Sequence, residues 1–363
     1  MSVPADRIAK KARIKRATIA AQQRVREIDA EAIRAVTAAY LEAQRDVEDR
    51  IRRLGAADGS FRLDALQRIR DQIELALQAL ADQRGPLLTQ YLDQAAAAGA
   101  GVHGELLGSS QQRIANEAAQ FVQEFVAEDG LALSDRLHRL DRGAAEAMGN
   151  AVQRAVITGI DASLAARDYL DRGAPVPQDV QARINNAEAG RVARQAAQAL
   201  TTGQMDPRAQ ALRVFRTEIN RAHGVAYREA GFEDPDVIGT RFLLSPRHPA
   251  PDICDMYASA DLHGLGPGVY PKGKSPWPAH PNTLSFEEVV FADEVRSGDG
   301  QAADDWIKEQ PADVRAGVLG SEAKRRAFDA GHVSNDGVRT PWRVLRQRLQ
   351  QQGIDTDQFE GKT

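Results

Sequence analysis

The fold of this chain is decided by residues 241–290, which read RFLLSPRHPAPDICDMYASADLHGLGPGVYPKGKSPWPAHPNTLSFEEVV. The stretch contains the sole cysteine of the chain, Cys254, three of its seven histidines and many prolines and glycines. The sequence before it is periodic and helical in character, and the sequence after it predicts a shorter helical tail. We expect function in this stretch, because loops on a rigid scaffold usually carry it.

The composition of the 363 residues favours helices over a β-sandwich or a β-barrel. Apolar residues make up 42% of the chain and aromatic residues only 5%, while alanine and glutamine are abundant, as in helix bundles and coiled coils. One cysteine excludes an intramolecular disulfide framework and fits a reducing compartment. The charged N-terminus lacks the apolar segment of a secretory signal, and no long apolar window predicts a membrane span.

The net charge of −4 is unevenly distributed along the chain. Residues 1–27 contain eight lysines and arginines against two acids. Such a run is most simply the solvated face of a helix, but it also fits an arm that contacts phosphates. In this second interpretation, the residues expected to contact phosphates are Arg7, Lys10, Lys11, Arg13, Lys15 and Arg16.

Apolar residues recur every three, four or seven positions through residues 28–54 and 63–80, which predicts two long helices joined as an antiparallel αα-hairpin. Gly85 and Pro86 predict a turn after the second helix. The predicted regions are an extended helical region with a basic start (1–130), a helical connecting region (131–205), a core (206–295) and a short helical tail (296–363). The fold class is therefore mainly α, with long helices and αα-hairpins and a small α+β C-terminal domain that contains a short β-sheet and a long Pro/Gly-rich loop.

The predicted core begins with a helix over residues 206–230. Asp206 is its expected cap, Pro207 its first residue, and Gly231 its expected end. Residues 237–244 and 284–291 have strand character and are expected to pair. The glycines of GLGPG, at 264–268, do not match a phosphate-binding loop and predict turns with positive φ.

The residues between the two strands need something to hold them in place. His248, Cys254 and His280, with His263 beside them, are candidate zinc ligands, because zinc takes nitrogen and sulfur donors. A strong zinc signal has paired ligands at short spacing, which is missing here. The simpler interpretation is a loop held by prolines, aromatic packing and hydrogen bonds, whose expected residues are Asp252, Asp255, Tyr270, Trp277 and Pro281.

The landmarks of residues 206–333 occur in a specific order: RTEINRA at 216–222, a strand, DICD at 252–255, GLGPGVYP at 264–271, AHPN at 279–282, and a Trp-led helix before VLG at 318–320. In this order the chain resembles the phage head morphogenesis family, the minor head proteins similar to phage Mu protein F and its relatives in SPP1-type phages. The resemblance marks a family helix that contains Arg216, Glu218, Asn220 and Arg221.

The chain departs from the pattern of that family in its cysteines. Many relatives carry a CxxC pair in the loop and HPxCxC after it, which together look like a zinc knuckle. Here Cys254 matches the first position, Tyr257 stands at the second, and Thr283 and Ser285 replace the last two. These departures favour loss of the metal, so no cofactor is expected. The alternative is a zinc site in which His248, His280 and an aspartate join Cys254.

The resemblance implies a structural role and no catalytic residues: a minor head protein of the virion, found in the host cytoplasm during assembly, that acts in head assembly and in DNA packaging or ejection. Its implied partners are the portal protein, the major capsid or scaffold protein, and the packaged DNA. The alternative is an enzyme, a toxin-like or nucleotide-modifying domain in the C-terminal half. It would be built on the Arg216 and Glu218 helix with Cys254 and His280, but no dense catalytic motif supports it.

Overall fold

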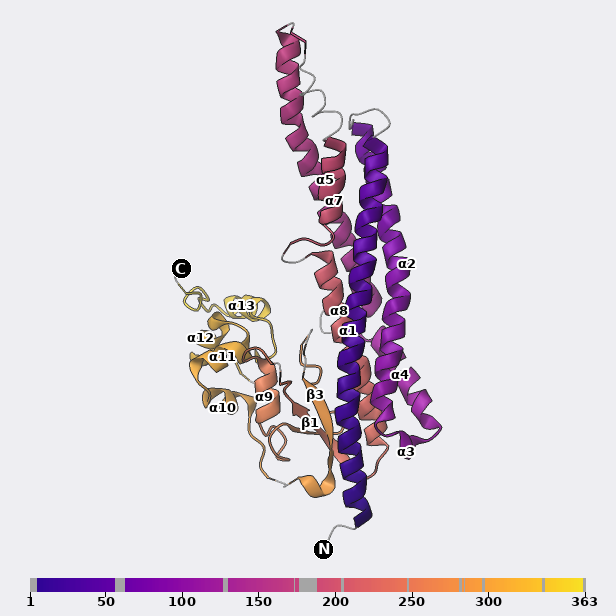
Figure 1. The fold of residues 1–363 in the computed structure, drawn as a ribbon. Helices are drawn as coiled ribbons and strands as arrows, with labels where there is room; N and C mark the ends of the chain where they lie inside the picture. Colours follow the sequence, from indigo (N-terminus) through magenta and orange to yellow (C-terminus); the bar gives the residue numbers. More distant parts are fainter. Residues whose placement is uncertain are drawn as a thin grey trace. The chain divides into compact units, whose positions relative to one another are not determined.

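The computed structural model describes residues 5–55, 63–126, 130–172, 174–175, 188–203, 206–246, 248–280, 283, 285–295, 298–334 and 337–361. The predicted fold class is confirmed, because the chain is mainly helical and carries a small antiparallel sheet in its C-terminal half (Figure 1). Two compact units are each assembled from separate stretches of chain. Unit 1 contains Met1–Gln23, Ala96–Ala118 and Asn220–Thr363, and unit 2 contains Arg24–Ala95 and Ala119–Ile219.

The described helices that precede the sheet differ widely in length. They are α1 (Ala5–Gly55), α2 (Leu63–Gly101), α3 (Gly104–Leu107), α4 (Ser110–Glu124), α5 (Leu133–Asp171), α7 (Glu188–Gln198) and α8 (Pro207–Phe232).

In unit 2, α1 and α2 form the predicted antiparallel hairpin. Three hydrogen bonds fix their register: Arg50 donates to Gln72 at 3.4 Å, Gln83 to Glu42 at 3.3 Å, and Arg84 to the Tyr40 hydroxyl at 3.2 Å. One sequence number rises as the other falls, as antiparallel packing requires. The predicted apolar seam is buried here, through Val36, Tyr40, Val47 and Ile51.

The predicted turn at Gly85 and Pro86 is wrong, because α2 runs through both residues. A proline inside a helix removes one hydrogen bond and costs about 3 kcal/mol relative to alanine. The apolar stripe of α2 continues on both sides of it, however, and Leu80, Leu88 and Leu92 are all buried. Burial of a leucine side chain contributes about 1.5–3 kcal/mol, so a few such residues outweigh the defect.

Helix α8 begins as its sequence predicts. The Asp206 carboxylate accepts a hydrogen bond from the backbone N–H of Ala209 at 2.8 Å, and Pro207 is the first helical residue. The prediction that Gly231 ends the helix is wrong, because α8 continues to Phe232. Gly231 is needed for close packing within unit 1, since a Cβ there would lie 2.5 Å from the Val289 side chain and 3.1 Å from His103.

The predicted pairing of the two strands is confirmed in unit 1. β1 (Val237–Leu243) pairs antiparallel with β3 (Phe286–Phe291), and Thr240 lies opposite Val289. A short strand that the sequence pattern missed, β2 (Val269–Pro271), adds to the other side of β1. Gly264, Gly266 and Gly268 have the positive φ expected of turn residues.

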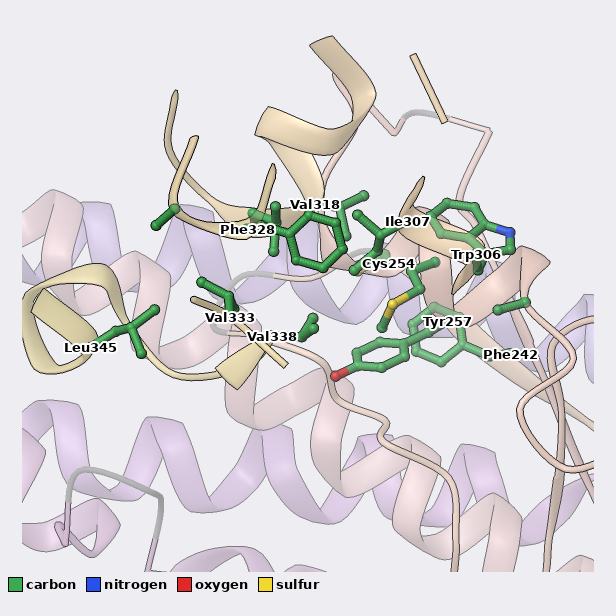
Figure 2. Close-up of a cluster of buried hydrophobic side chains, with 14 of the residues drawn as sticks. Phe242, Cys254, Tyr257, Trp306, Ile307, Val318, Phe328, Val333, Val338 and Leu345 are labelled. Carbon is green, nitrogen blue, oxygen red and sulfur yellow. The ribbon is translucent and has the colours of Figure 1, made fainter. Parts of the chain in front are cut away.

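The loop and the C-terminal tail of unit 1 share one apolar core (Figure 2). The loop contributes α9 (Ile253–Ser259), with Cys254 and Tyr257 buried. Trp306, Phe328 and Leu345 of the tail are buried in the same cluster. The remaining elements of the unit are η2 (Ala292–Glu294), α10 (Ala303–Lys308), α11 (Ala312–Leu319), α12 (Glu322–Asp329) and α13 (Trp342–Gln351).

Candidate functional site

The N-terminus of α9 is fixed by two aspartates, each of which accepts a hydrogen bond from a backbone N–H of the first turn. Asp252 Oδ1 accepts a hydrogen bond from the backbone N–H of Cys254 at 2.7 Å. Asp255 Oδ2 accepts one from the backbone N–H of Asp252, also at 2.7 Å. This reciprocal capping satisfies two N–H groups that a helix N-terminus leaves without partners. It also holds both carboxylates and the Cys254 side chain in a fixed relative position.

Two of the loop side chains converge on one imidazole nitrogen of a third. His280 Nε2 lies 3.2 Å from Cys254 Sγ and 3.1 Å from Asp252 Oδ2. Cys254 is buried, and its sulfur also lies 3.6 Å from Thr283 Oγ1. Burial alone would raise the pKa of Asp252, but hydrogen bonds from His280 and from Cys254 outweigh burial, so that this pKa lies below its ordinary value.

The second loop histidine belongs to an adjoining group. His248 Nε2 lies 2.8 Å from Asp255 Oδ2 and 3.9 Å from Asp252 Oδ1. Asp252 therefore belongs to both groups, one with Cys254 and His280 and the other with His248 and Asp255. The third histidine of the loop is engaged elsewhere, since the His263 ring packs edge-on against Tyr270 with centroids 5.3 Å apart.

The contacts of His280 can be compared with those of a cysteine nucleophile activated by histidine. In such sites one imidazole nitrogen faces the nucleophile and the other is oriented by a third group. Here the thiol of Cys254 and the carboxylate of Asp252 approach the same atom, Nε2 of His280. Of the three candidate metal ligands, the structure thus brings Cys254 and His280 together with Asp252, and it places His248 in the adjoining group.

The predicted structural loop residues are held by direct contacts within unit 1. Tyr270 and Trp277 are both buried, as expected. The Tyr270 hydroxyl donates to the Tyr257 carbonyl at 2.9 Å, and Trp277 Nε1 donates to the Ser285 carbonyl at 2.9 Å. The indole ring fills the space beside Gly224, where a Cβ would lie 2.0 Å from it. Pro281 lies outside the described residues.

The helix residues that carry the resemblance make contacts within each unit. In unit 2, Arg216 pairs with Asp29 at 3.2 Å, and the buried Glu218 accepts a hydrogen bond from Arg136 at 2.8 Å. In unit 1, Asn220 Nδ2 donates to the Thr283 carbonyl at 3.1 Å. Arg221 is buried in the same helix.

Most of the basic residues at the N-terminus have acidic partners within unit 1. Arg7 pairs with Asp236 at 2.6 Å, and Arg13 pairs with Glu105 at 2.9 Å. Two further ion pairs join Lys10 to the buried Asp234, and Lys11 to Asp293. Lys15 and Arg16, the other two residues of the predicted DNA-binding arm, are exposed.

Sequence reasoning missed a buried polar column in unit 1. The rings of His103 and His223 lie on Tyr227, with centroids 5.3 and 6.1 Å away. Burial lowers the pKa of each histidine to about 4. The Tyr227 hydroxyl accepts a hydrogen bond from the backbone N–H of Val289 at 3.0 Å. Only the spacing of His223 and Tyr227, one turn apart on the apolar face of α8, signalled a buried pair.

No model of a known protein family, no curated protein and no solved structure matches this chain. Within the described residues, no helix combines the length and the apolar character needed to cross a lipid bilayer.

Proposed function

We propose that this protein is a structural minor head protein of a tailed phage, acting in head assembly and in DNA packaging or ejection through contacts with the portal, the major capsid protein or the scaffold. The proposal rests on the family resemblance of residues 206–333. One observation carries it: the residues of that pattern make contacts that stabilise the fold. Asn220 fastens the family helix to the loop at Thr283, and Trp277 fills the hollow at Gly224.

The charged residues of the pattern support the same conclusion. A catalytic site needs groups that are free to react with a substrate in a cleft. Glu218 is buried and already bound by Arg136, while Asp252 and Asp255 cap a helix. Side chains with these contacts fix the backbone and stabilise the core. A rigid core is what an assembly protein requires.

The proposed contact with packaged DNA falls to the exposed cations of α1. The carboxylates that neutralise Arg7, Lys10, Lys11 and Arg13 would oppose phosphate binding by these residues. Lys15 and Arg16 are exposed. We expect weak duplex binding whose salt dependence falls by about two phosphate contacts in the double variant Lys15→Ala/Arg16→Ala, measured by filter binding at several salt concentrations. Unchanged salt dependence would contradict the DNA contact.

Mass spectrometry of purified phage particles tests the head assignment. We expect a constant number of copies of this chain per particle, and chemical crosslinks from it to portal or capsid protein. Host cytosolic proteins serve as the control for carry-over during purification. The variant Gly224→Leu, which forces a side chain into the Trp277 ring, should lose incorporation, whereas Gly190→Ala should keep it because no atom lies within 4 Å of its Cβ position. Absence of the chain from washed particles would refute the proposal.

A further inference from the structure

We infer that unit 1 contains a binding site for a protonated phosphate group, supplied by inorganic phosphate or by a terminal phosphate monoester. The site is a pocket of about 160 Å³ between residues 11–18 of α1 and the paired strands β1 and β3. An ion of the size of phosphate fits with some water, because one water molecule occupies about 30 Å³ in the liquid. The inference rests on the side chains of this pocket and does not depend on a role in a phage head.

The buried hydroxyl groups in the lining of the pocket are already engaged. The backbone N–H of Val289 donates to the Tyr227 hydroxyl at 3.0 Å. The Thr18 hydroxyl donates to the Ile14 carbonyl at 2.9 Å, so the Tyr227 hydroxyl donates its own proton to the Thr18 oxygen, 3.2 Å away. A ligand must therefore be bound by the charged side chains of the lining.

Two of the five charged side chains that line the pocket are bound to neighbouring parts of the protein. Lys11 forms an ion pair with Asp293, and its Nζ lies 4.9 Å from the centroid of the Phe291 ring. Glu294 Oε2 accepts a hydrogen bond from the backbone N–H of Phe291 at 2.9 Å. These contacts fasten α1 to the end of β3 and so fix one wall of the pocket.

The other three charged side chains can bind a ligand. Within the part of the chain that the structure describes, the side chains of Lys15, Arg241 and Glu288 form no ion pair or hydrogen bond. Arg241 of β1 lies directly opposite Glu288 of β3, so both side chains extend from the same face of the sheet. Both are half-buried, whereas Lys15 is exposed. The pocket thus offers two cations and one carboxylate to the same ligand.

This combination of charges selects among anions. Arginine and lysine donate charge-assisted hydrogen bonds to the oxygens of an anion. A carboxylate only accepts hydrogen bonds, so Glu288 repels a fully deprotonated anion but accepts a hydrogen bond from a P–OH group. Inorganic phosphate keeps a proton at neutral pH, and a phosphate monoester keeps its last proton up to about pH 6. Sulfate and the internal phosphodiesters of DNA carry no such proton, and we expect the pocket to reject them.

NMR of the arginine Nε–Hε groups in the full chain tests the site, and the Arg241 signal is identified by its absence from Arg241→Gln. At about pH 6.5 and constant ionic strength, sodium phosphate should shift this signal saturably, with a dissociation constant on the order of 1 mM. Sodium sulfate should leave the signal in place. Glu288→Gln removes the repelling charge, so sulfate should then shift the signal as phosphate does. Lys15→Gln should weaken phosphate binding by roughly twofold to fivefold, as expected for an exposed charge.

Arg16→Gln is the matched control, because Arg16 is an exposed cation of the same helix that does not line the pocket. It should keep the phosphate affinity while removing one of the two cations proposed to contact DNA, so failure of that contact and failure of this site are distinguishable.

A short duplex with 5′-phosphate ends, compared with the same duplex with 5′-hydroxyl ends, identifies the source of the phosphate. Competition with inorganic phosphate by the phosphorylated duplex alone would show that a DNA end fills the site, and no competition by either duplex would assign the site to inorganic phosphate. The absence of a saturable shift with phosphate would overturn the inference. An equal shift with sulfate in the unaltered chain would also overturn it, because it would show unselective anion binding.

Discussion

Two pairs of histidines in unit 1 lie in opposite environments. His103 and His223 pack against Tyr227 in a buried column, where both nitrogens of His103 and Nε2 of His223 have no hydrogen-bond partner among the described residues. His248 and His280 lie near the surface, and each has an aspartate oxygen about one hydrogen bond away, at 2.8 and 3.1 Å. The same side chain is thus kept neutral by burial in one place and paired with anions in the other.

The difference shows that the contribution of a histidine depends on what its nitrogens meet. In the column the rings pack against one another and join separate stretches of chain. His103 follows α2, and His223 lies on α8. The Tyr227 hydroxyl lies 3.2 Å from the Thr18 hydroxyl of α1. In the loop the rings act through their nitrogen atoms and fix carboxylates. Protonation of the buried histidines in acid should therefore destabilise the column. The stability of the loop should depend on the contacts between its histidine nitrogens and its carboxylates.

The largest expected effect is loss of stability in acid. Because burial lowers the pKa of His103 and His223 from 6.5 to about 4, the unfolded chain binds more protons than the folded chain between these values. Stability is therefore complete above about pH 6.5 and falls as the pH drops toward 4, by up to roughly 3 kcal/mol for each histidine. Urea unfolding at a series of pH values measures this loss.

The double variant His103→Leu/His223→Leu isolates the contribution of the column from that of the carboxylates. Its stability should fall less between pH 6.5 and pH 4 than that of the unaltered chain. His138→Gln, at an exposed position, should leave the pH profile unchanged. Parallel pH profiles for the double variant and the unaltered chain would show that the column does not carry the acid sensitivity.

A somewhat smaller effect is expected where α2 meets the column. A Cβ at Gly99 would lie 2.2 Å from the His223 carbonyl oxygen and 2.9 Å from the Tyr227 nitrogen. Backbone atoms of a helix cannot move aside cheaply, so Gly99→Ala should cost about 1–3 kcal/mol in thermal or urea unfolding. Gly101→Ala is the control, because its nearest neighbour is a flexible Gln111 side chain at 3.5 Å. Equal stability of the two variants would contradict this close packing.

The loop should respond to loss of a capping carboxylate. Asp255→Ala removes the acceptor for the backbone N–H of Asp252 and for His248, and should cost about 0.5–2 kcal/mol. Asp305→Ala, a matched change in the first turn of α10, removes an exposed pair with Lys308 and should cost less than Asp255→Ala, because solvent screens an exposed ion pair. Chemical denaturation followed by circular dichroism compares them, and a larger loss at Asp305 would reverse the expected order.

The smallest effect concerns the electrostatics of the column. Burial is the main reason for the low pKa of His103; Asp234 opposes it, and the positive charge of Lys10 adds to it. Lys10→Gln should therefore raise the pKa of His103, by less than about one unit. NMR titration of the His103 ring protons measures the change. Lys15→Gln, an exposed lysine on the same helix, should leave the titration where it was, and a downward shift in Lys10→Gln would contradict the assigned charges.

Much of the framework was predictable because its signals are local. The apolar seam of α1, the cap at Asp206 and the strand character of residues 237–243 follow from side-chain periodicity and backbone chemistry. The aromatic residues Tyr270 and Trp277 were expected inside the loop, and both are buried. The short strand β2 escaped prediction, because three residues are too few to show an alternating pattern.

The sequence by itself determined the long helices, the pairing of the two longer strands, and the position of the long loop within residues 241–290. Only the tertiary structure decided that α2 passes through Pro86 and that the His103 ring packs on Tyr227. It also decided that polar atoms of Asp252, Cys254 and His280 lie within 4.8 Å of one another. The physical reason is distance along the chain. Helix periodicity and capping act between neighbours, whereas these three outcomes depend on burial and contacts between residues that only the folded backbone brings together.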